Sequence, residues 1–106
     1  MNPAASVLAK HPNKVPVILQ RDLCCNDLPE LTRRKFLLPL DLSVSHFLYY
    51  IRRQLSVPSH ISVFIYVNQT LPSLQQPMSL IYEEEQSCDG ILYIYYASEH
   101  TFGGVA

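Results

Sequence analysis

The sequence has few charged residues and no long apolar run. Charged residues make up 16% of its 106 positions, hydrophobic residues make up 48%, and the net charge is −1. This composition predicts one globular domain spanning 1–106 and argues against a disordered chain or a general nucleic-acid binder. No apolar run approaches the length that crosses a bilayer, and no secretory signal opens the chain.

Cysteine and histidine are too few and too irregularly spaced to indicate a metal site. The three cysteines, Cys24, Cys25 and Cys88, are odd in number, and two of them are adjacent. No C-x-x-C or H-x-x-x-H spacing occurs. We therefore expect no disulfides, no metal and no cofactor, and a reduced, cytosolic protein.

Cations are missing from the second half of the chain. All eight Lys and Arg residues lie between Lys10 and Arg53, whereas acidic residues gather at 83–85 and Asp89. A run of cations such as 33–35 is most simply a solvated face. The separation of the charges nevertheless predicts a basic surface suited to a partner with acidic residues.

The stretch 32–58 predicts a strand that leads into a long amphipathic helix. Ser43 is placed to cap the helix start, and Arg52 and Arg53 lie in its last turns, where cations interact favourably with the helix dipole. Pro58 closes the segment. The apolar residues follow the spacing i, i+3, i+4, i+7 and i+11, and so form one continuous stripe: Val44, Phe47, Leu48, Ile51 and Leu55.

Strand patterns occur at four places, which are 14–21, 34–40, 61–67 and 91–96. Pro16 has no backbone N–H, so we expect it at a free edge or a bulge. The segment 61–67 is β-branched and aromatic throughout, which predicts a strand buried on both faces. The tyrosines of 91–96 favour core and sheet packing over the stacking of RNA bases, because few cations accompany them.

The remaining segments predict short helices, turns and a tail. We expect a helix within 4–10, part of an N-terminal extension at 1–13, and a second helix at 77–85. Asn68 with Gln69, and Asp89 with Gly90, are typical of tight turns, and 97–106 predicts a flexible tail. The order of elements predicts an α+β domain in which one long helix packs across a mixed sheet.

Five segments together carry a resemblance to a known family. They resemble, in order, the autophagy ubiquitin-like modifiers, the family of GABARAP and microtubule-associated light chain 3, between about His11 and Gly103: HPNKVPVILQR, TRRKFLLPLDLSVSHFLYYIRRQL, FIYVNQTLPS, MSLIYEEE and DGILYIYYASEHTFGG. The resemblance implies a ubiquitin-like β-grasp, with a mixed four-stranded sheet, and a modifier rather than an enzyme. That family usually has two helices before its first strand, and this chain has room for only the second, short one.

The C-terminus matches the family's processing site. In the family a cysteine protease cuts after Phe-Gly or Tyr-Gly, and activating and conjugating enzymes join the glycine to phosphatidylethanolamine. Phe102 and Gly103 match that pair, which implies a cytoplasmic protein that becomes peripheral on autophagosomal membranes after lipidation. Cleavage after Gly104 instead would suggest conjugation to protein lysines. A peptide-binding adaptor that is never conjugated is the other alternative.

The resemblance also implies a peptide-binding groove. In the family, receptors with an aromatic-x-x-aliphatic motif, often preceded by acidic residues, add as a strand beside the second strand. The positions that match the aromatic pocket are Val7, Pro16, Lys35, Leu37 and Ile91. Those that match the aliphatic pocket are Phe36, Leu38, Pro39, Leu42, Phe47, Tyr50 and Ile51. The cations expected to meet the acidic flank are Lys14, Arg33, Arg34 and Lys35.

Overall fold

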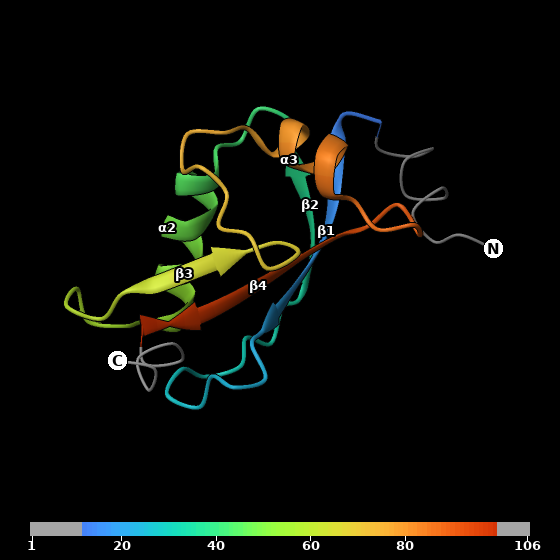
Figure 1. Cartoon of the computed structure of the whole chain (residues 1–106). Coiled ribbons are helices and arrows are strands. Elements are labelled where there is room, and N and C mark those ends of the chain that lie inside the picture. The colour runs from blue at the N-terminus through green and yellow to red at the C-terminus, as the bar shows by residue number, and fades with distance from the viewer. Residues whose placement is uncertain (1–11, 100–106) are drawn as a thin grey trace.

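The computed structural model describes residues 12–99 and shows a sheet crossed by one long helix (Figure 1). Its elements are, in chain order, β1 (Lys14–Arg21), β2 (Lys35–Pro39), α2 (Val44–Leu55), β3 (Val63–Tyr66), α3 (Met78–Glu85) and β4 (Leu92–Ser98). The predicted α+β class and this order of elements are confirmed. The helix expected within 4–10 lies outside the described residues.

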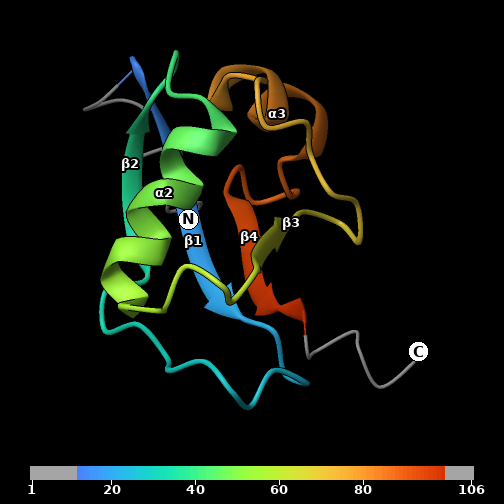
Figure 2. The same cartoon turned by 90° about the vertical axis from the view of Figure 1, so that its left-hand side faces the viewer.

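The four strands form one mixed sheet in the order β2-β1-β4-β3. β1 pairs in parallel with β4, and the two outer strands pair antiparallel with their neighbours. The first and last strands of the chain therefore lie side by side in the middle of the sheet, and α2 crosses one of its faces (Figure 2). This is the β-grasp arrangement that the family resemblance implied.

The helix α2 forms where its capping residue and its apolar stripe predict it. The Ser43 hydroxyl accepts a hydrogen bond from the His46 N–H at 3.2 Å, and Ser56 ends the helix in the left-handed conformation with φ 54°. The buried stripe belongs to the hydrophobic core and consists of Val44, Phe47, Ile51 and Leu55. Leu48 is only partly buried and packs at the margin of this core.

Pro16 lies at a locally free side of an interior strand. The Leu19 N–H donates to the Arg34 carbonyl of the segment leading into β2 at 2.7 Å, so alternation turns the nitrogens of even-numbered β1 residues toward β4. Pairing with β4 begins only at Val17, opposite Leu92. The missing N–H of Pro16 therefore costs the sheet no hydrogen bond, although β1 is an interior strand and not the free edge that was predicted.

Two predictions are wrong: the burial of β3 and the start of the C-terminal tail. β3 spans Val63–Tyr66 and is an outer strand, with buried residues alternating with half-buried ones, so it is not buried on both faces. The expected tail begins too early, because Ala97 and Ser98 belong to β4 and are fully buried. In both cases sheet pairing, which composition does not show, decides the outcome.

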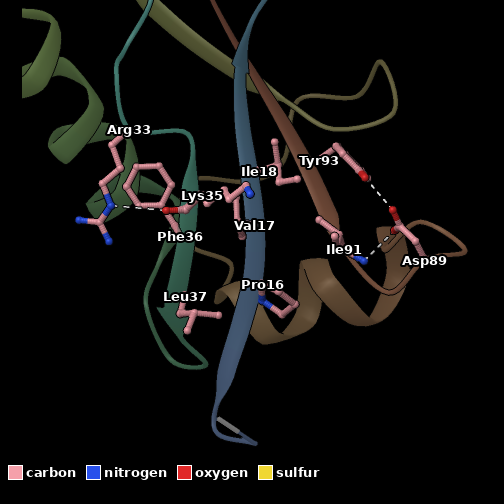
Figure 3. A pocket seen from close by; sticks show the side chains of 10 residues that line it. All are labelled: Pro16, Val17, Ile18, Arg33, Lys35, Phe36, Leu37, Asp89, Ile91 and Tyr93. Carbon is pink, nitrogen blue, oxygen red and sulfur yellow. Dashed lines mark hydrogen bonds between the residues drawn. The ribbon is translucent and has the colours of Figure 1, made fainter. Parts of the chain in front are cut away.

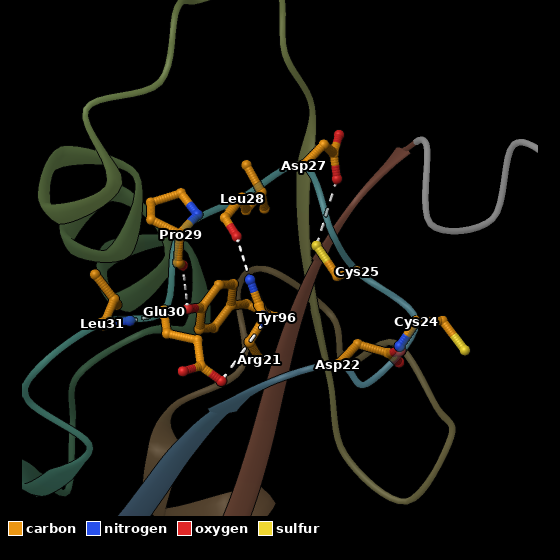
Figure 4. Close-up of polar contacts among 10 residues, drawn as sticks. All are labelled: Arg21, Asp22, Cys24, Cys25, Asp27, Leu28, Pro29, Glu30, Leu31 and Tyr96. Atoms are coloured by element: carbon orange, nitrogen blue, oxygen red, sulfur yellow. Dashed lines mark hydrogen bonds and ion pairs between the residues drawn. The ribbon is translucent and has the colours of Figure 1, made fainter.

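The loop 22–32 is held against the end of β4 by polar side chains (Figure 4). The Tyr96 hydroxyl donates to the Pro29 carbonyl at 2.7 Å and accepts from the Leu31 N–H at 3.1 Å. The Ser98 hydroxyl donates to the Asp27 carboxylate at 2.7 Å. These contacts join residues far apart in the chain and hold the loop against the last residues of β4.

Replacing Tyr96 with Phe should lower the free energy of unfolding by about 1–3 kcal/mol, because two backbone groups lose their partner.

Burial raises the pKa of the Tyr96 hydroxyl above its ordinary value of 10.0. A raised folded-state pKa gives stability that is complete below pH 10 and is lost as pH rises through that pKa. Urea unfolding should therefore show the Tyr96→Phe deficit shrinking above pH 10. Tyr49→Phe, at a ring that is 60% exposed, is the control and should change nothing.

Candidate functional site

β2 offers one free edge and two different faces. It lies at the outside of the sheet, and only its β1 side is paired. Phe36 and Leu38 are buried toward α2, whereas Lys35, Leu37 and Pro39 are exposed on the other face. The same alternation turns the backbone groups of Lys35 and Leu37 toward the free edge. A strand with this geometry can accept another strand beside it.

A cavity of about 630 Å³ lies beside β2 and extends across β1 (Figure 3). We call it the outer pocket, and its lining residues are Pro16, Val17, Ile18, Arg33, Lys35, Phe36, Leu37, Asp89, Ile91 and Tyr93. Much of the floor of this pocket is formed by residues that the strand register places side by side. Ile18 pairs with Lys35 on one side and with Tyr93 on the other, which makes one row across three strands.

A second cavity of about 260 Å³ lies between β2 and α2. We call it the helix-side pocket, and it is lined by Arg33, Phe36, Leu37, Leu38, Leu42, His46, Phe47 and Tyr50. Its wall is aromatic: the Phe36 ring meets the Phe47 ring edge-on at 5.5 Å between centroids and the Tyr50 ring at 5.8 Å. Both pockets are lined by Arg33, Phe36 and Leu37, so the β2 segment separates the two cavities.

Opposite charges stand at the two sides of the outer pocket. The Arg33 guanidinium lies 4.6 Å from the centre of the Phe36 ring, and its Nε donates to the Lys35 carbonyl at 3.4 Å. Across β1, the Asp89 carboxylate accepts from the Tyr93 hydroxyl at 2.6 Å and from the Ile91 N–H at 3.0 Å (Figure 3).

These hydrogen bonds shift the ionisation of both side chains. The bond from the Tyr93 hydroxyl, followed by that from the Ile91 N–H, lowers the pKa of Asp89 below its ordinary value. The same bond to Asp89, with burial as a smaller cause, raises the pKa of Tyr93. Asp89 is therefore a carboxylate at neutral pH, and Tyr93 keeps its proton.

Most of the predicted groove residues come together around β2. Pro16, Lys35, Leu37 and Ile91 line the outer pocket. Five others line the helix-side pocket, namely Phe36, Leu38, Leu42, Phe47 and Tyr50. Val7 lies outside the described residues, as do Phe102, Gly103 and Gly104.

Four predicted residues lie away from both pockets. Ile51 is 0% exposed and belongs to the core, because its side of α2 faces the sheet. Pro39 and Lys14, which pair with each other, line neither cavity. Arg34 is exposed, but it lies beside Leu31 and Tyr96 rather than beside the two pockets.

Sequence reasoning missed five of the lining residues, which are Val17, Ile18, Asp89, Tyr93 and His46. Ile18 lies two residues after Pro16, and residues at that spacing share one face of a strand, so Ile18 could have been found. His46 lies four residues before Tyr50, and residues at that spacing share one face of a helix, so His46 could also have been found. Asp89 and Tyr93 carried no such signal, because only the parallel pairing of β1 with β4 brings them into the lining of the outer pocket, across β1 from β2.

Within residues 12–99 no helix is long and apolar enough to cross a membrane. The same residues contain no cluster of three His, Cys, Asp or Glu side chains that could hold a metal ion. Cys24 and Cys88 are exposed, Cys25 is buried, and all three are free thiols.

Comparison with known proteins gives one consistent family. The family profile described as ubiquitin-like autophagy protein Atg8 matches residues 1–103. The chain is 43% identical to autophagy-related protein 8 of Kluyveromyces marxianus over 98 residues, which is 92% of this chain and 78% of that protein. It is 38% identical to autophagy-related protein 8b of Arabidopsis thaliana, covering 98% and 84%. The crystal structure of Trypanosoma brucei ATG8 superposes with a TM-score of 0.82 at 34% identity, covering 91% and 82%.

Replacing Ile51 with Ala tests its placement in the core. The side chain is fully buried, so we expect the free energy of unfolding to fall by about 2–5 kcal/mol. The folded fraction should keep its affinity for groove peptides, because Ile51 touches neither cavity. Thermal unfolding and peptide titration at a temperature where the variant is folded measure the two effects. Weakened peptide binding with unchanged stability would place Ile51 in the pocket wall instead.

Proposed function

The chain belongs to the Atg8 family of ubiquitin-like autophagy proteins, and on that premise we propose that it is conjugated to membrane lipid and recruits receptors through the groove along β2. Proteins of this family are ubiquitin-like modifiers and adaptors, not enzymes, and they work in a ubiquitin-like conjugation pathway. The observation that carries the proposed recruitment is a free strand edge with one apolar pocket on each side.

An added strand matches this geometry. Side chains alternate faces along a strand, so residues i and i+3 point to opposite faces, about 10 Å apart. A peptide paired with the free edge of β2 would therefore send one such side chain into the outer pocket and the other into the helix-side pocket. The larger cavity suits an aromatic ring and the smaller one an aliphatic side chain. This is the spacing of an aromatic-x-x-aliphatic motif.

The charge around β2 favours peptides with acidic flanks. Arg33 and Lys35 are exposed and line the pockets, so they meet the ligand directly. Arg34 is also exposed and adds charge at a greater distance. Such cations raise the association rate and fix the orientation of an acidic ligand more than they raise its affinity.

Conjugation is proposed to use Gly103, after a processing cysteine protease removes 104–106. Activating-like and conjugating-like enzymes would then transfer the glycine to phosphatidylethanolamine on the autophagosomal membrane. Glycine suits both steps, because a side chain would obstruct a narrow protease cleft and the attack on a thioester carbonyl. The unmodified protein would be cytoplasmic.

Replacing Leu37 with Asp should weaken binding of an aromatic-x-x-aliphatic peptide at least about tenfold, since a charge then enters both apolar linings. Leu37 is 37% exposed, so the fold should survive. Leu40→Asp is the matched control, because Leu40 is 38% exposed, lies just beyond the end of β2 and lines neither pocket. Isothermal titration of both variants with the peptide measures the two affinities. An equal loss of affinity in both variants would place the binding site elsewhere.

Replacing Gly103 with Ala should abolish conjugation. The measurement is the intact mass of the chain after incubation with cytosol and phosphatidylethanolamine-containing membranes. The natural chain should lose 104–106 and gain the mass of a phospholipid, whereas Gly103→Ala should gain none. Peptide binding should be unchanged in both.

Gly104→Ala is the control for the acceptor position and should still be lipidated at Gly103. Loss of 105–106 alone, with adducts of protein mass, would instead indicate conjugation to lysines through Gly104. An unchanged mass, with the enzymes shown to be active on another substrate, would leave only a peptide-binding adaptor.

A further inference from the structure

The outer pocket contains one acidic side chain that the proposed strand pairing does not use. Among its described lining residues Asp89 is the only acid, and it comes from the turn before β4, on the side of β1 opposite Lys35 (Figure 3). The Tyr93 hydroxyl binds the Asp89 carboxylate, and the register places Lys35, Ile18 and Tyr93 in one row, so the Cα atoms of Lys35 and Tyr93 lie about 10 Å apart, across two strand spacings. The floor between them is apolar.

Asp89 is held in place and still has capacity to bind. The Ile91 N–H fixes one oxygen at 3.0 Å, and the Tyr93 hydroxyl fixes the other at 2.6 Å. A carboxylate offers about four lone pairs, so further hydrogen bonds can be accepted. Its pKa is lowered by these same bonds, which keeps the acceptor charged at neutral pH.

We propose that Asp89 accepts a hydrogen bond from a ring N–H or O–H of the aromatic side chain in the outer pocket, and so selects tryptophan or tyrosine over phenylalanine. The inference rests on the proposed function, because it requires that an aromatic residue enters this pocket. The faces of the ring then contact Ile18, Pro16 and Ile91, while Asp89 accepts the hydrogen bond from its N–H or O–H. Tyr93 acts as a positioning residue that orients the carboxylate.

The geometry favours a neutral donor on a ring over a cationic side chain at this place. Lys35 and Arg33 line the same cavity and would repel a ligand cation. An indole or phenol adds only one polar atom, which Asp89 can satisfy, and keeps the remaining area apolar. A phenyl ring fills the same space but leaves the carboxylate without that bond.

The test compares peptides that differ only in the ring donor. One peptide carries tryptophan and the other carries benzothienylalanine, in which sulfur replaces the ring N–H at nearly the same size. With the full chain, the tryptophan peptide should bind about tenfold more tightly, the lower end for a hydrogen bond to a charged group. Asp89→Ser retains an oxygen for the Ile91 N–H but cannot reach the ring, and should bring the ratio close to one.

Two further variants separate the roles. Tyr93→Phe leaves Asp89 in place and should keep most of the discrimination. Asp41→Asn, at an exposed acid outside both linings, should keep all of it. A ratio near one in the natural chain would overturn the proposal, as would a ratio that survives Asp89→Ser. Loss of the ratio in Tyr93→Phe but not in Asp89→Ser would assign the acceptor to the hydroxyl and equally overturn it.

The outcomes also distinguish this inference from the proposed function. If neither peptide binds, while unfolding curves show an intact fold, the groove itself is disproved and Asp89 has no ring to select. If both peptides bind equally well and Leu37→Asp weakens both, the groove stands and only the role of Asp89 is lost.

Discussion

The packing of Phe36 against Phe47 and Tyr50 is the interaction on which the groove depends. It joins β2 to α2 through edge-on ring contacts at 5.5 and 5.8 Å, and the Phe47 and Tyr50 rings stack at 6.4 Å. Aromatic pairs of this kind contribute about 0.5–1.5 kcal/mol beyond the burial of their area. Because Phe36 also lines both pockets, the contact that holds an outer strand to the helix also fixes the partition between the two cavities.

The parallel pairing of β1 with β4 brings distant residues to the outer pocket that the chain next to β2 does not provide. It brings Tyr93 opposite Ile18, and with it the Asp89 turn, to the side of the pocket that faces Lys35. The same pairing continues to Arg21 opposite Tyr96, where the loop 22–32 is fastened. One ladder therefore positions both the acidic side of the outer pocket and the end of β4, after which the residues proposed for conjugation follow in the chain.

The two faces of the same short strand differ in burial. Phe36 and Leu38 are at most 7% exposed and belong to the core, whereas Leu37 is 37% exposed and lies over the cavities. Substitutions on the outward face can therefore alter the lining of the outer pocket while the core stays packed. Charges follow the same division: Lys35 is exposed on the outward face, and no described charged residue belongs to the buried core.

The sequence by itself determined the elements and the nature of the groove strand. Helical spacing and the Ser43 cap set α2, the apolar run after Lys35 indicated the strand β2, and Asn68 with Gln69 set a tight turn, seen in their positive φ angles of 50° and 65°. These are local properties, in which each residue acts on neighbours a few positions away. Most of the residues that line the helix-side pocket come from β2 and α2, which are adjacent in the chain, and the family resemblance named most of them, although it missed His46.

Only the tertiary structure decided which strands became outer ones and which distant side chains met. β3 has the composition of a central strand but pairs on one side only, and Ile51 shares the stripe of Phe47 but faces the sheet fully. Asp89 and Tyr93 reach the outer pocket through pairing across more than 70 positions of chain, as the register of Ile18 with Tyr93 shows. Such contacts depend on the order of strands in the sheet, and no local spacing in the sequence encodes that order.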